Sequence, residues 1–424
     1  MHKLLTVDIW DTLLRRNCHP EAVKLATAQH LFLRFPGRFA AGFHDHWALY
    51  GKRPEIEHVM AQEAEAAGFD GEYAISAVMV RWLKAVLAQP YPGDIDRIAE
   101  GLVETELAFE MENTRRDPDV AAILARHPAE LTLFLSDFYM PGPLLSRLLA
   151  HHHLEDSVPS GHVSCDLMRN KRSGRLFTYI HEKYGVRPDE HVHVGDNLHS
   201  DVAVARRLGI TAVAFLPEDG HAARMAREAL FPSRRALFAH LHAATRDELM
   251  RSQQADEAPD SPFRHGAAQA VTFMAATLAA AERAIMKGGD GIALGNDAGF
   301  SAHLFRTLFP DGRHGGHDIP LTGGFGQGDE VLPASFREGA GRDRLDVPAF
   351  QDGILLAARI WAPVLRSHAV MARELEDATL PAPPDVPSSY SAPPASGRLD
   401  RWRRRIGVLF RSILTNTEKD SDRP

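Results

Sequence analysis

The sequence has little cysteine, no long apolar run and no excess of basic residues, and each absence excludes a class of protein. Its 424 residues include two cysteines, Cys18 and Cys165, too few for a disulfide framework and not in a metal-binding spacing, so a reducing compartment is expected. No uncharged apolar stretch reaches about 18 residues, so no transmembrane helix is expected. The net charge of −8, with no basic face in the main body, argues against a nucleic-acid binder.

The amino-terminal residues also lack the features of an export signal. The apolar run in residues 1–14 is interrupted by Asp8 and Asp11, and no cleavage-like small residues accompany it. We therefore expect a cytoplasmic protein, in which any membrane contact is peripheral and at the inner face of the membrane. Its expected partners are small molecules or proteins.

The alternation of apolar runs and helical periods predicts an α/β core. Short apolar runs, typical of buried strands in a parallel sheet, occur at residues 3–9, 131–135, 191–194 and 212–215. Helical periods occur between them at residues 143–151, 172–184 and 202–208. Strands that alternate with helices predict a parallel sheet that is covered on both faces.

An all-helical insert of about 100 residues is predicted after the first strand. Its periodicity predicts helices at residues 21–33, 55–67, 73–87 and 95–111. After the core, a helical bridge (230–250) and a polar stretch (252–261) lead to a second region. There we expect a helix (267–286), a strand (291–294), a helix (301–308), a strand ending at Thr322 and a closing helix (349–373). This pattern predicts a smaller α/β domain at residues 263–376.

The carboxyl-terminal residues differ in composition from both predicted domains. Residues 377–397 are rich in Pro, Ala and Ser, which predicts a flexible, partly extended linker. Residues 398–414 place Trp402, Leu409 and Phe410 at helical spacing among several arginines. Basic amphipathic helices of this kind bind anionic membranes or partner grooves. The alternative is a helix that docks on its own protein.

Polar residues suited to phosphoryl transfer stand after the first two core strands. In V-D-I-W-D-T-L-L, Asp8 ends the first strand and the Thr12 hydroxyl follows shortly after it. In F-L-S-D-F-Y-M, Ser136 ends the second core strand. Because ligands of such sheets bind just beyond the carboxyl ends of the strands, Asp8 is the candidate nucleophile and Ser136 the candidate donor to a phosphoryl oxygen.

Two further motifs supply charge of both signs. Lys171, in N-K-R-S-G-R-L-F before a predicted helix, offers a fixed positive charge that can bridge a carboxylate and a phosphate. Asp196 and Asp201, in V-H-V-G-D-N-L-H-S-D-V, offer hard oxygen ligands beside a glycine that lets the backbone approach closely. Taken singly, these residues are also common as turn caps, surface lysines or helix N-terminal pairs. In this order they predict a magnesium site and a nucleophile.

The order Asp8, Ser136, Lys171 and Asp196/Asp201 resembles the four signature motifs of the haloacid dehalogenase-like (HAD) hydrolase superfamily. More narrowly, D-I-W-D-T-L-L-R-R, S-D-F-Y-M-P and K-R-S-G-R-L-F are similar to a bacterial subgroup of predicted hydrolases associated with surface-polysaccharide glycosyltransferases. The resemblance covers about residues 3–216.

This resemblance implies a Rossmann-like core within residues 1–230, with the helical insert, about residues 15–128, as a cap. It also implies an aspartyl-phosphate on Asp8. Magnesium would be held by Asp8, Asp196 and a backbone carbonyl at Trp10, with Asp201 in support. Residues 231–262 would be the bridge and polar linker, followed by the domain at 263–376, the linker at 377–397 and the tail at 398–424.

One departure from the family pattern concerns the residue two after the nucleophile. Family phosphatases carry there a second aspartate that acts as general acid and base, whereas this chain has Trp10. Proton transfer of that kind contributes roughly 100- to 10,000-fold. The main hypothesis is a magnesium-dependent phosphatase of a small phosphorylated metabolite such as a sugar phosphate. The alternative is a catalytically weak ligand-binding or assembly protein of a surface-polysaccharide system. A dehalogenase is disfavoured, because Asp196 and Asp201 would then have no metal to bind.

Other candidate features carry weaker signals. Arg15 and Arg16 would meet an anionic substrate or lie on the surface. The histidines at 44 and 46, and at 151–153, do not have the spacing that puts ligands on one helical face. The glycine-rich segment 323–328 resembles a phosphate-binding loop, but Pro333 argues against the helix that should follow it. Residues 295–299, between a predicted strand and helix, are a better-placed ligand loop.

Overall fold

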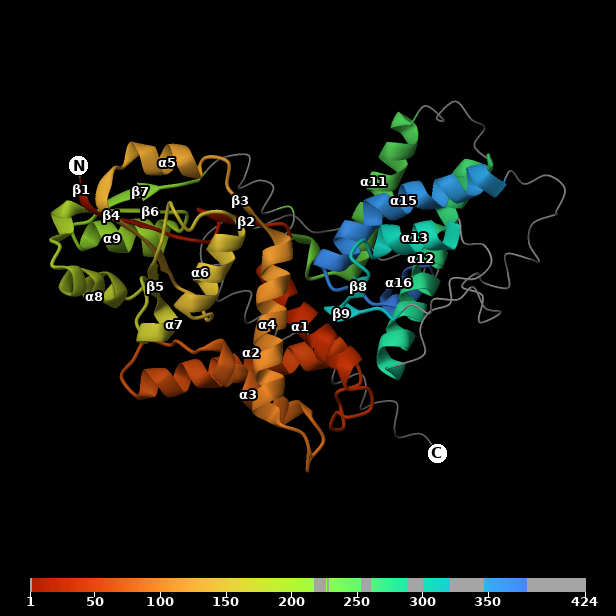
Figure 1. The fold of residues 1–424 in the computed structure, drawn as a ribbon, viewed down its shortest axis with the longest axis horizontal. Helices are drawn as coiled ribbons and strands as arrows, with labels where there is room; N and C mark the ends of the chain where they lie inside the picture. The colour runs from red at the N-terminus through yellow and green to blue at the C-terminus, as the bar shows by residue number, and fades with distance from the viewer. Residues whose placement is uncertain are drawn as a thin grey trace, which may run out of the picture. The chain divides into compact units, whose positions relative to one another are not determined.

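Five parallel strands form the central sheet, in the order β5-β4-β1-β6-β7 (Figure 1). They are β1 (His2–Val7), β4 (Ala129–Ser136), β5 (Gly161–Val163), β6 (His191–Gly195) and β7 (Thr211–Ala214). The computed structural model describes residues 2–216, 226, 229–252, 261–288, 300–320 and 347–379. The predicted α/β class with a Rossmann-like core is confirmed. Because β1 lies between β4 and β6, its carboxyl end is flanked by two other strand ends.

Successive residues of each strand pack into different cores, as the pleat of a strand requires. Leu4 faces one side with α8 (Arg175–Tyr184), the π-helical turn η2 (Leu198–Val204) and α9 (Ala205–Arg207). Leu5 faces the other side, with α5 (Val120–Arg126) and α6 (Gly142–His151). Both faces are therefore buried, which explains why the strands are continuous apolar runs in the sequence.

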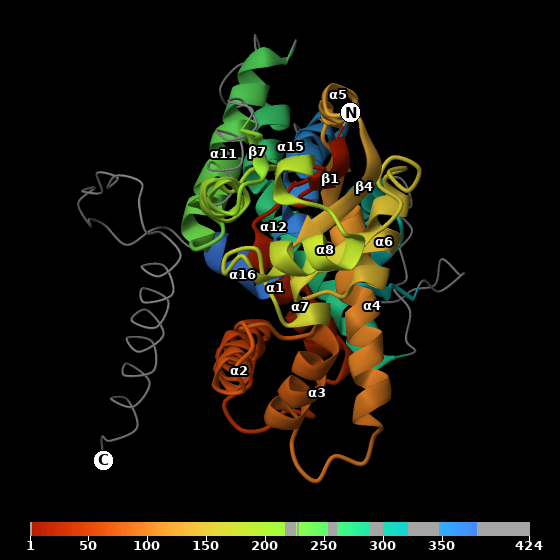
Figure 2. The same ribbon diagram turned by 90° about the vertical axis from the view of Figure 1, so that its left-hand side faces the viewer.

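Four helices form the insert after β1 (Figures 1 and 2). They are α1 (Pro20–Arg34), α2 (His46–Ala66), α3 (Ile75–Val86) and α4 (Ile95–Asn113). Figure 2 shows α2 and α3 together at one end, with α4 running back toward the sheet. The insert is not all-helical, however. Its two ends pair as an antiparallel ribbon of β2 (Leu14–Arg16) and β3 (Thr114–Arg116), which returns the chain to the core.

Two element predictions were wrong in detail, and one short strand was not predicted. The second cap helix begins at His46 rather than at residue 55, because the Asp45 side chain caps the Ala48 amide at 2.7 Å and the helix continues through Pro54. The closing helix is two helices, α15 (Val347–Ser367) and α16 (Ala372–Thr379), which are separated by a turn with Ala369 at φ 50°. Strand β5 was missed, because three residues are too few to give a periodic signal.

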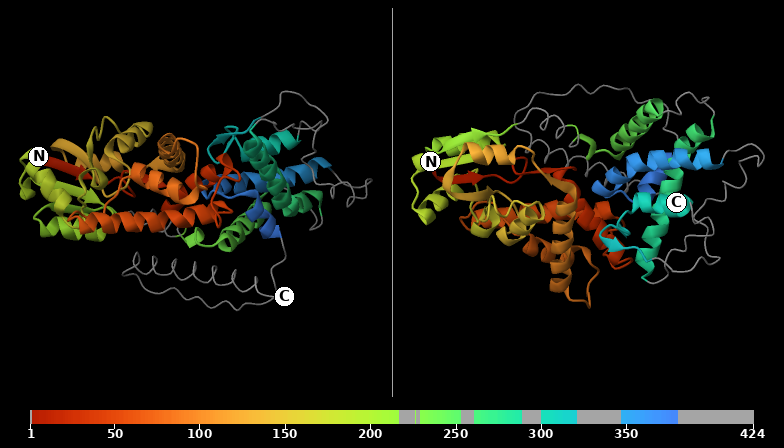
Figure 3. Two further views of the ribbon diagram at one scale, coloured as in Figure 1. Left: turned by 90° about the horizontal axis from the view of Figure 1, so that it is seen from below. Right: turned by 45° about the horizontal axis from the view of Figure 1, so that its top comes forward.

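Helices also dominate the second region. They are α11 (Arg234–Arg251), α12 (Pro262–Lys287), α13 (Phe300–Leu308), α15 and α16, which share one apolar core (Figure 3). A hairpin of β8 (Arg313–His314) and β9 (His317–Asp318) completes the described part. The α/β character predicted for residues 263–376 is therefore not found among these residues. The expected strand at 291–294, the end of the strand at Thr322, both glycine-rich segments and the tail lie outside the described residues.

This helical region contacts the cap through Glu374 at the start of α16. The Glu374 carboxylate accepts hydrogen bonds from Trp47 Nε1 at 2.8 Å and from Arg234 Nε at 2.7 Å. Burial works to raise the pKa of Glu374, but the hydrogen bond with His46 and the charge of Arg234 hold it at about 2. Residues 1–380 form one compact unit, and Glu374 joins the cap to the helices within it.

Candidate active site

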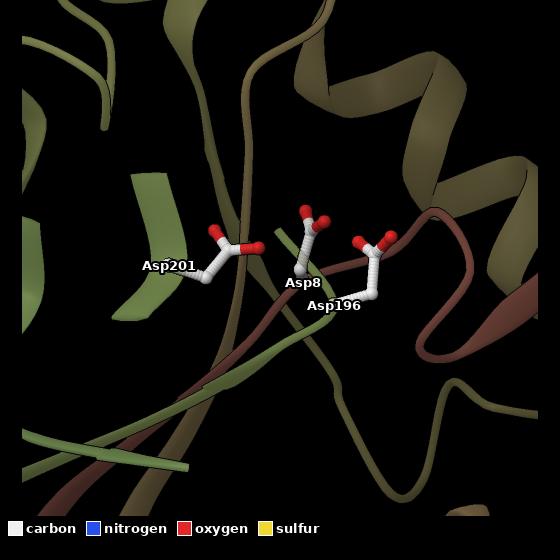
Figure 4. A group of neighbouring side chains, drawn as sticks. All are labelled: Asp8, Asp196 and Asp201. Atoms are coloured by element: carbon white, nitrogen blue, oxygen red, sulfur yellow. The ribbon is translucent and has the colours of Figure 1, made fainter. Parts of the chain in front are cut away.

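The carboxyl ends of β1 and β6 bring three carboxylates together. Asp8 follows β1 directly, and its backbone amide donates to Val194 O of β6 at 2.9 Å. Asp196 follows β6, and Asp201 lies on η2. One carboxylate oxygen from each residue lies within 4.8 Å of the other two. In Figure 4 the three side chains rise on the same side of the strand ends, with Asp8 in the middle.

This donor set fits a magnesium ion. Hard divalent cations prefer carboxylate oxygens, and Mg²⁺ uses one or two carboxylates together with substrate phosphates. Asp8 is 7% exposed and Asp201 is fully buried, so their charges need a cation nearby. Within the described ranges, no second group of His, Cys, Asp and Glu side chains is arranged to hold an ion.

Lys171 supplies part of the required positive charge. Its Nζ lies 2.9 Å from Asp8 Oδ1 and 2.6 Å from Asp201 Oδ1, and its side chain is almost fully buried. Its backbone amide donates to Asp137 Oδ1 at 2.8 Å, which fixes the loop before α8. Burial works to lower the pKa of Lys171, but Asp201, Asp8 and Asp137 together raise it above its ordinary value. Lys171 therefore keeps its proton and its positive charge, and it does not act as a general acid.

The two carboxylates that Lys171 contacts differ in acidity. Burial raises the pKa of Asp8 well above its ordinary value, and the charges of Asp201 and Asp196 oppose the effect of Lys171. Burial also works to raise the pKa of Asp201, but Lys171 and His193 bring it below its ordinary value. Asp201 is thus a fixed anion, while Asp8 is the carboxylate whose charge depends most on an added cation.

Gly195 allows Asp201 to sit this close to the strand, as the sequence predicted. A Cβ atom at Gly195 would lie 2.4 Å from Asp201 Oδ2, far inside a normal contact. The Asp201 oxygens accept from the Asn197 amide at 2.9 Å and contact His193 Nε2 at 3.2 Å. Burial lowers the pKa of His193, so its ring is neutral. We did not predict this histidine from the sequence.

The hydroxyls of Thr12 and Ser136 are buried and have no hydrogen-bond partner among the described residues. Thr12 lies in the loop after β1, and Ser136 ends β4, the neighbouring strand. Buried polar groups are normally paired, so each unpaired hydroxyl requires an explanation. An anion bound at the carboxyl edge of the sheet would accept both hydrogen bonds.

Comparison with protein families gives one match. Residues 168–240 match the family model described as HAD-hydrolase-like. This match supports the HAD-like hydrolase superfamily. The matched segment includes Lys171, Asp196 and Asp201. A search of curated proteins found no significant match. Among the helices of the described residues, none is long and apolar enough to cross a membrane.

Several solved structures are similar to about half of the chain. A 2-haloacid dehalogenase from Pseudomonas syringae pv. tomato has 21% identity and a TM-score of 0.37, over 51% of this chain and 86% of that chain. A predicted phosphoglycolate phosphatase from Haemophilus somnus has 15% identity and a TM-score of 0.31, over 49% and 83%. A HAD family enzyme from Bacteroides thetaiotaomicron, solved with magnesium and inorganic phosphate, has 12% identity and a TM-score of 0.33, over 51% and 96%.

Trp10 is held in place by the side chains packed around it. The Arg16 guanidinium lies over its ring at 3.5 Å, and Phe138 packs against it with ring centroids 4.7 Å apart. Glu110 holds Arg16 in turn, with Nη2 to Oε1 at 2.7 Å. The indole N–H of Trp10 is buried and has no hydrogen-bond partner among the described residues. In this it is like the hydroxyls of Thr12 and Ser136.

The two arginines that follow the nucleophile loop are paired inside the protein. Arg15 forms a buried ion pair with Asp117, and Arg16 pairs with Glu110. Neither is therefore a solvated surface charge. Both guanidinium groups have carboxylate partners, while Arg15 Nη2 is buried and makes no hydrogen bond within the described residues.

A cap loop contacts the loop that carries Lys171, which we did not predict. The Asp70 carboxylate accepts from the Asn170 amide at 2.7 Å and from the Ser173 hydroxyl at 2.7 Å. The Glu72 carboxylate accepts from the Asn170 side chain at 2.9 Å. Residues 70–72, which we call the tether, thus hold the α/β core and its cap together beside the site. No sequence motif marks the tether.

Proposed function

We propose that this chain is a magnesium-dependent phosphohydrolase that acts on a small phosphorylated metabolite through an aspartyl-phosphate intermediate. The observation that carries the proposal is the group of Asp8, Asp196 and Asp201, with oxygens within 4.8 Å of one another and Lys171 between two of them. The unpaired hydroxyls of nearby strand ends support an anionic substrate. Metal, nucleophile and anion donors together suit phosphoryl transfer.

In this proposal Asp8 attacks the phosphorus atom of the substrate. A bond forms between an Asp8 carboxylate oxygen and phosphorus, while the bond to the leaving oxygen breaks and that oxygen takes the electron pair. Lys171, Thr12 and Ser136 donate hydrogen bonds to the phosphoryl oxygens. A water oxygen then bonds to the phosphorus of the aspartyl-phosphate, while the bond between phosphorus and the Asp8 oxygen breaks and that oxygen takes the electron pair. This step restores the Asp8 carboxylate and releases inorganic phosphate and a proton to solvent.

Magnesium, when bound, would neutralise the charge of the phosphoryl group and of the surrounding carboxylates. Asp8, Asp196 and the Trp10 backbone carbonyl would hold it, with Asp201 in support. Lys171 already balances part of the charge of Asp8 and Asp201. The chain alone therefore leaves a net negative charge at the site. A dication would offset this charge and so allow a phosphate dianion to bind.

Trp10 restricts the substrates that such an enzyme would turn over. An indole N–H donates a hydrogen bond but does not give up its proton at ordinary pH. Without a general acid, the leaving oxygen must depart unprotonated, at a cost of roughly 100- to 10,000-fold for a poor leaving group. We therefore expect acyl phosphates, and phosphate esters with stable leaving anions, to react best. Sugar phosphates are also to be tested, because of the resemblance to the polysaccharide-associated subgroup.

Trp10 equally supports the second candidate, a ligand-binding or assembly protein with weak catalysis. In that case the same groups would bind magnesium and a phosphorylated ligand, and the ligand would be released unchanged. This candidate differs from the first in turnover and not in binding. Assays of both properties on one protein sample distinguish them.

The experiment is a hydrolysis panel with wild type, Asp8→Asn and Asp189→Asn, in magnesium and in chelator. Asp189 is a matched control, because its carboxylate is 70% exposed on the surface. The panel contains acetyl phosphate, p-nitrophenyl phosphate, sugar phosphates and 2-chloropropionate. Turnover of a phosphate that requires Asp8 and magnesium, and not Asp189, would support the phosphohydrolase. Magnesium binding without turnover would favour the binding protein, and metal-independent chloride release would overturn both.

A further inference from the structure

A row of buried side chains leads from the surface of α8 to Asp201. His181 Nε2 lies 2.9 Å from His191 Nδ1, and His191 Nε2 lies 2.7 Å from Thr6 Oγ1. Thr6 Oγ1 lies 2.6 Å from His193 Nδ1, and His193 Nε2 lies 3.2 Å from Asp201 Oδ1. Thr6, His191, His193 and Asp201 are all fully buried. The proposed chemistry uses only the last of these residues.

The hydrogen bonds of this row can run in only one direction. An ionised Asp201 can only accept, so His193 must donate from Nε2. A neutral ring then carries a lone pair on Nδ1, which accepts from the Thr6 hydroxyl. The Thr6 oxygen in turn accepts from His191 Nε2, and His191 Nδ1 accepts from His181 Nε2. Every donor therefore points toward Asp201, and each ring has a defined tautomer.

The row occupies one face of the sheet, and its members are held by that face. Thr6 on β1 is the register partner of His193 on β6, and His191 lies two residues earlier on the same side of β6. Phe177 of α8 packs edge-on against the His193 ring, with ring centroids 4.9 Å apart. The imidazole of His193 thus has no freedom to turn away from Asp201.

We propose that His193, fixed by Thr6 and His191, is a positioning residue that orients the Asp201 carboxylate beside the metal ion. The inference rests on the proposed magnesium site. Lys171 and His193 both contact Oδ1 of Asp201, so the two lone pairs of this oxygen are used. Among these contacts, Oδ2 of Asp201 accepts only from the backbone amide of Asn197. Oδ2 is therefore the Asp201 oxygen that remains available to bind a metal ion or a water molecule coordinated to the metal. Loss of such outer contacts typically weakens metal binding by about 10- to 100-fold.

The test is the affinity for Mg²⁺ alone, measured by calorimetry on the full chain without any substrate. Thr6→Val keeps the shape of the side chain but removes the hydroxyl that joins the two rings. His193→Leu removes the donor to Asp201, while His193→Gln retains an N–H donor. Thr277→Val is the matched control, since Thr277 is also buried and its hydroxyl donates to the Phe273 carbonyl within α12, at 2.8 Å. Thermal unfolding of each variant reports separately on stability.

We expect Thr6→Val and His193→Leu to bind Mg²⁺ about 10- to 100-fold more weakly, His193→Gln to recover most of the affinity, and Thr277→Val to match the wild type. Wild-type affinity in both Thr6→Val and His193→Leu would overturn the proposal. So would a His193→Gln variant that binds no better than His193→Leu, because the ring would then serve only packing. Absence of Mg²⁺ binding by the wild type would instead remove the proposed function itself. Should Thr6→Val fail to fold, the two His193 variants decide the question.

Discussion

Replacing Lys171 by methionine tests the electrostatics of the site most directly. Methionine fills a similar volume but leaves Asp8 and Asp201 without the cation that lies 2.9 and 2.6 Å from them. Removing one partner of a buried ion pair costs about 3–5 kcal/mol. An unfolding entropy of about 2.1 cal/mol/K per residue gives about 0.8 kcal/mol/K for the compact unit of 380 residues. The melting temperature in chelator should therefore fall by about 4–6 °C.

The sign of the pH dependence makes this prediction sharper. In the variant, the cation that opposes the effect of burial on Asp8 is lost, so the folded pKa of Asp8 lies still further above the unfolded value of about 3.9, and the folded pKa of Asp201 rises as well. A raised carboxyl pKa destabilises the folded state increasingly as the pH rises above the unfolded value. The loss should thus be larger at pH 8 than at pH 5.5, and magnesium should restore more stability to the variant than to the wild type.

The assay is thermal unfolding in chelator and in magnesium at both pH values, with Lys84→Met as the control, because Lys84 is exposed on α3. A Lys171→Met variant that melts like the wild type at pH 8 in chelator would refute the reasoning. A loss that is the same at both pH values and insensitive to magnesium would also refute it, since it would reflect packing alone.

Three other predictions address the metal, the cap and the tail. Burial raises the pKa of Asp8, so a proton competes with the metal, and calorimetry should show Mg²⁺ affinity rising from pH 6 to pH 8; a flat profile would contradict this. Asp70→Ala removes the acceptor of the Asn170 amide, so hydrogen exchange should accelerate in residues 168–175 but not in α12; unchanged protection there would count against the tether. Deleting residues 398–424 should abolish binding to anionic liposomes, and unaffected binding would exclude the tail as a membrane anchor.

Much of the core and its acidic site could be predicted from the sequence, because both depend on local patterns. The long strands are buried on both faces and appear as continuous apolar runs. Asp8 and Asp196 directly follow β1 and β6, and parallel strands bring their carboxyl ends to one edge of the sheet. The short strand β5 gives no such signal, and α2 continues through Pro54, which ordinarily marks a helix boundary.

The contacts around the site were harder to predict, because they join residues distant in sequence. Asp70 reaches Asn170 and Ser173 across about a hundred positions, without any motif to mark the pairing. The histidine row is, however, indicated by the sequence. His191 and His193 alternate with valines along one predicted strand, which places both rings on the same face of the sheet. Alternation of polar residues inside a buried strand was the signal that could have indicated them.

The cap contacts two other parts of the protein, the Lys171 loop and the helix α16. The tether joins the cap to the Lys171 loop, while Trp47 joins it to Glu374 at the start of α16. Glu282 of α12 in turn accepts from the backbone amide of Ala372 on α16, at 2.8 Å. The α12–α16 core is therefore linked through the cap, by direct contacts, to the loop that carries Lys171. Residues far from the carboxylates, such as Glu282, thus belong to the same network of contacts as the residues that hold Lys171 in place.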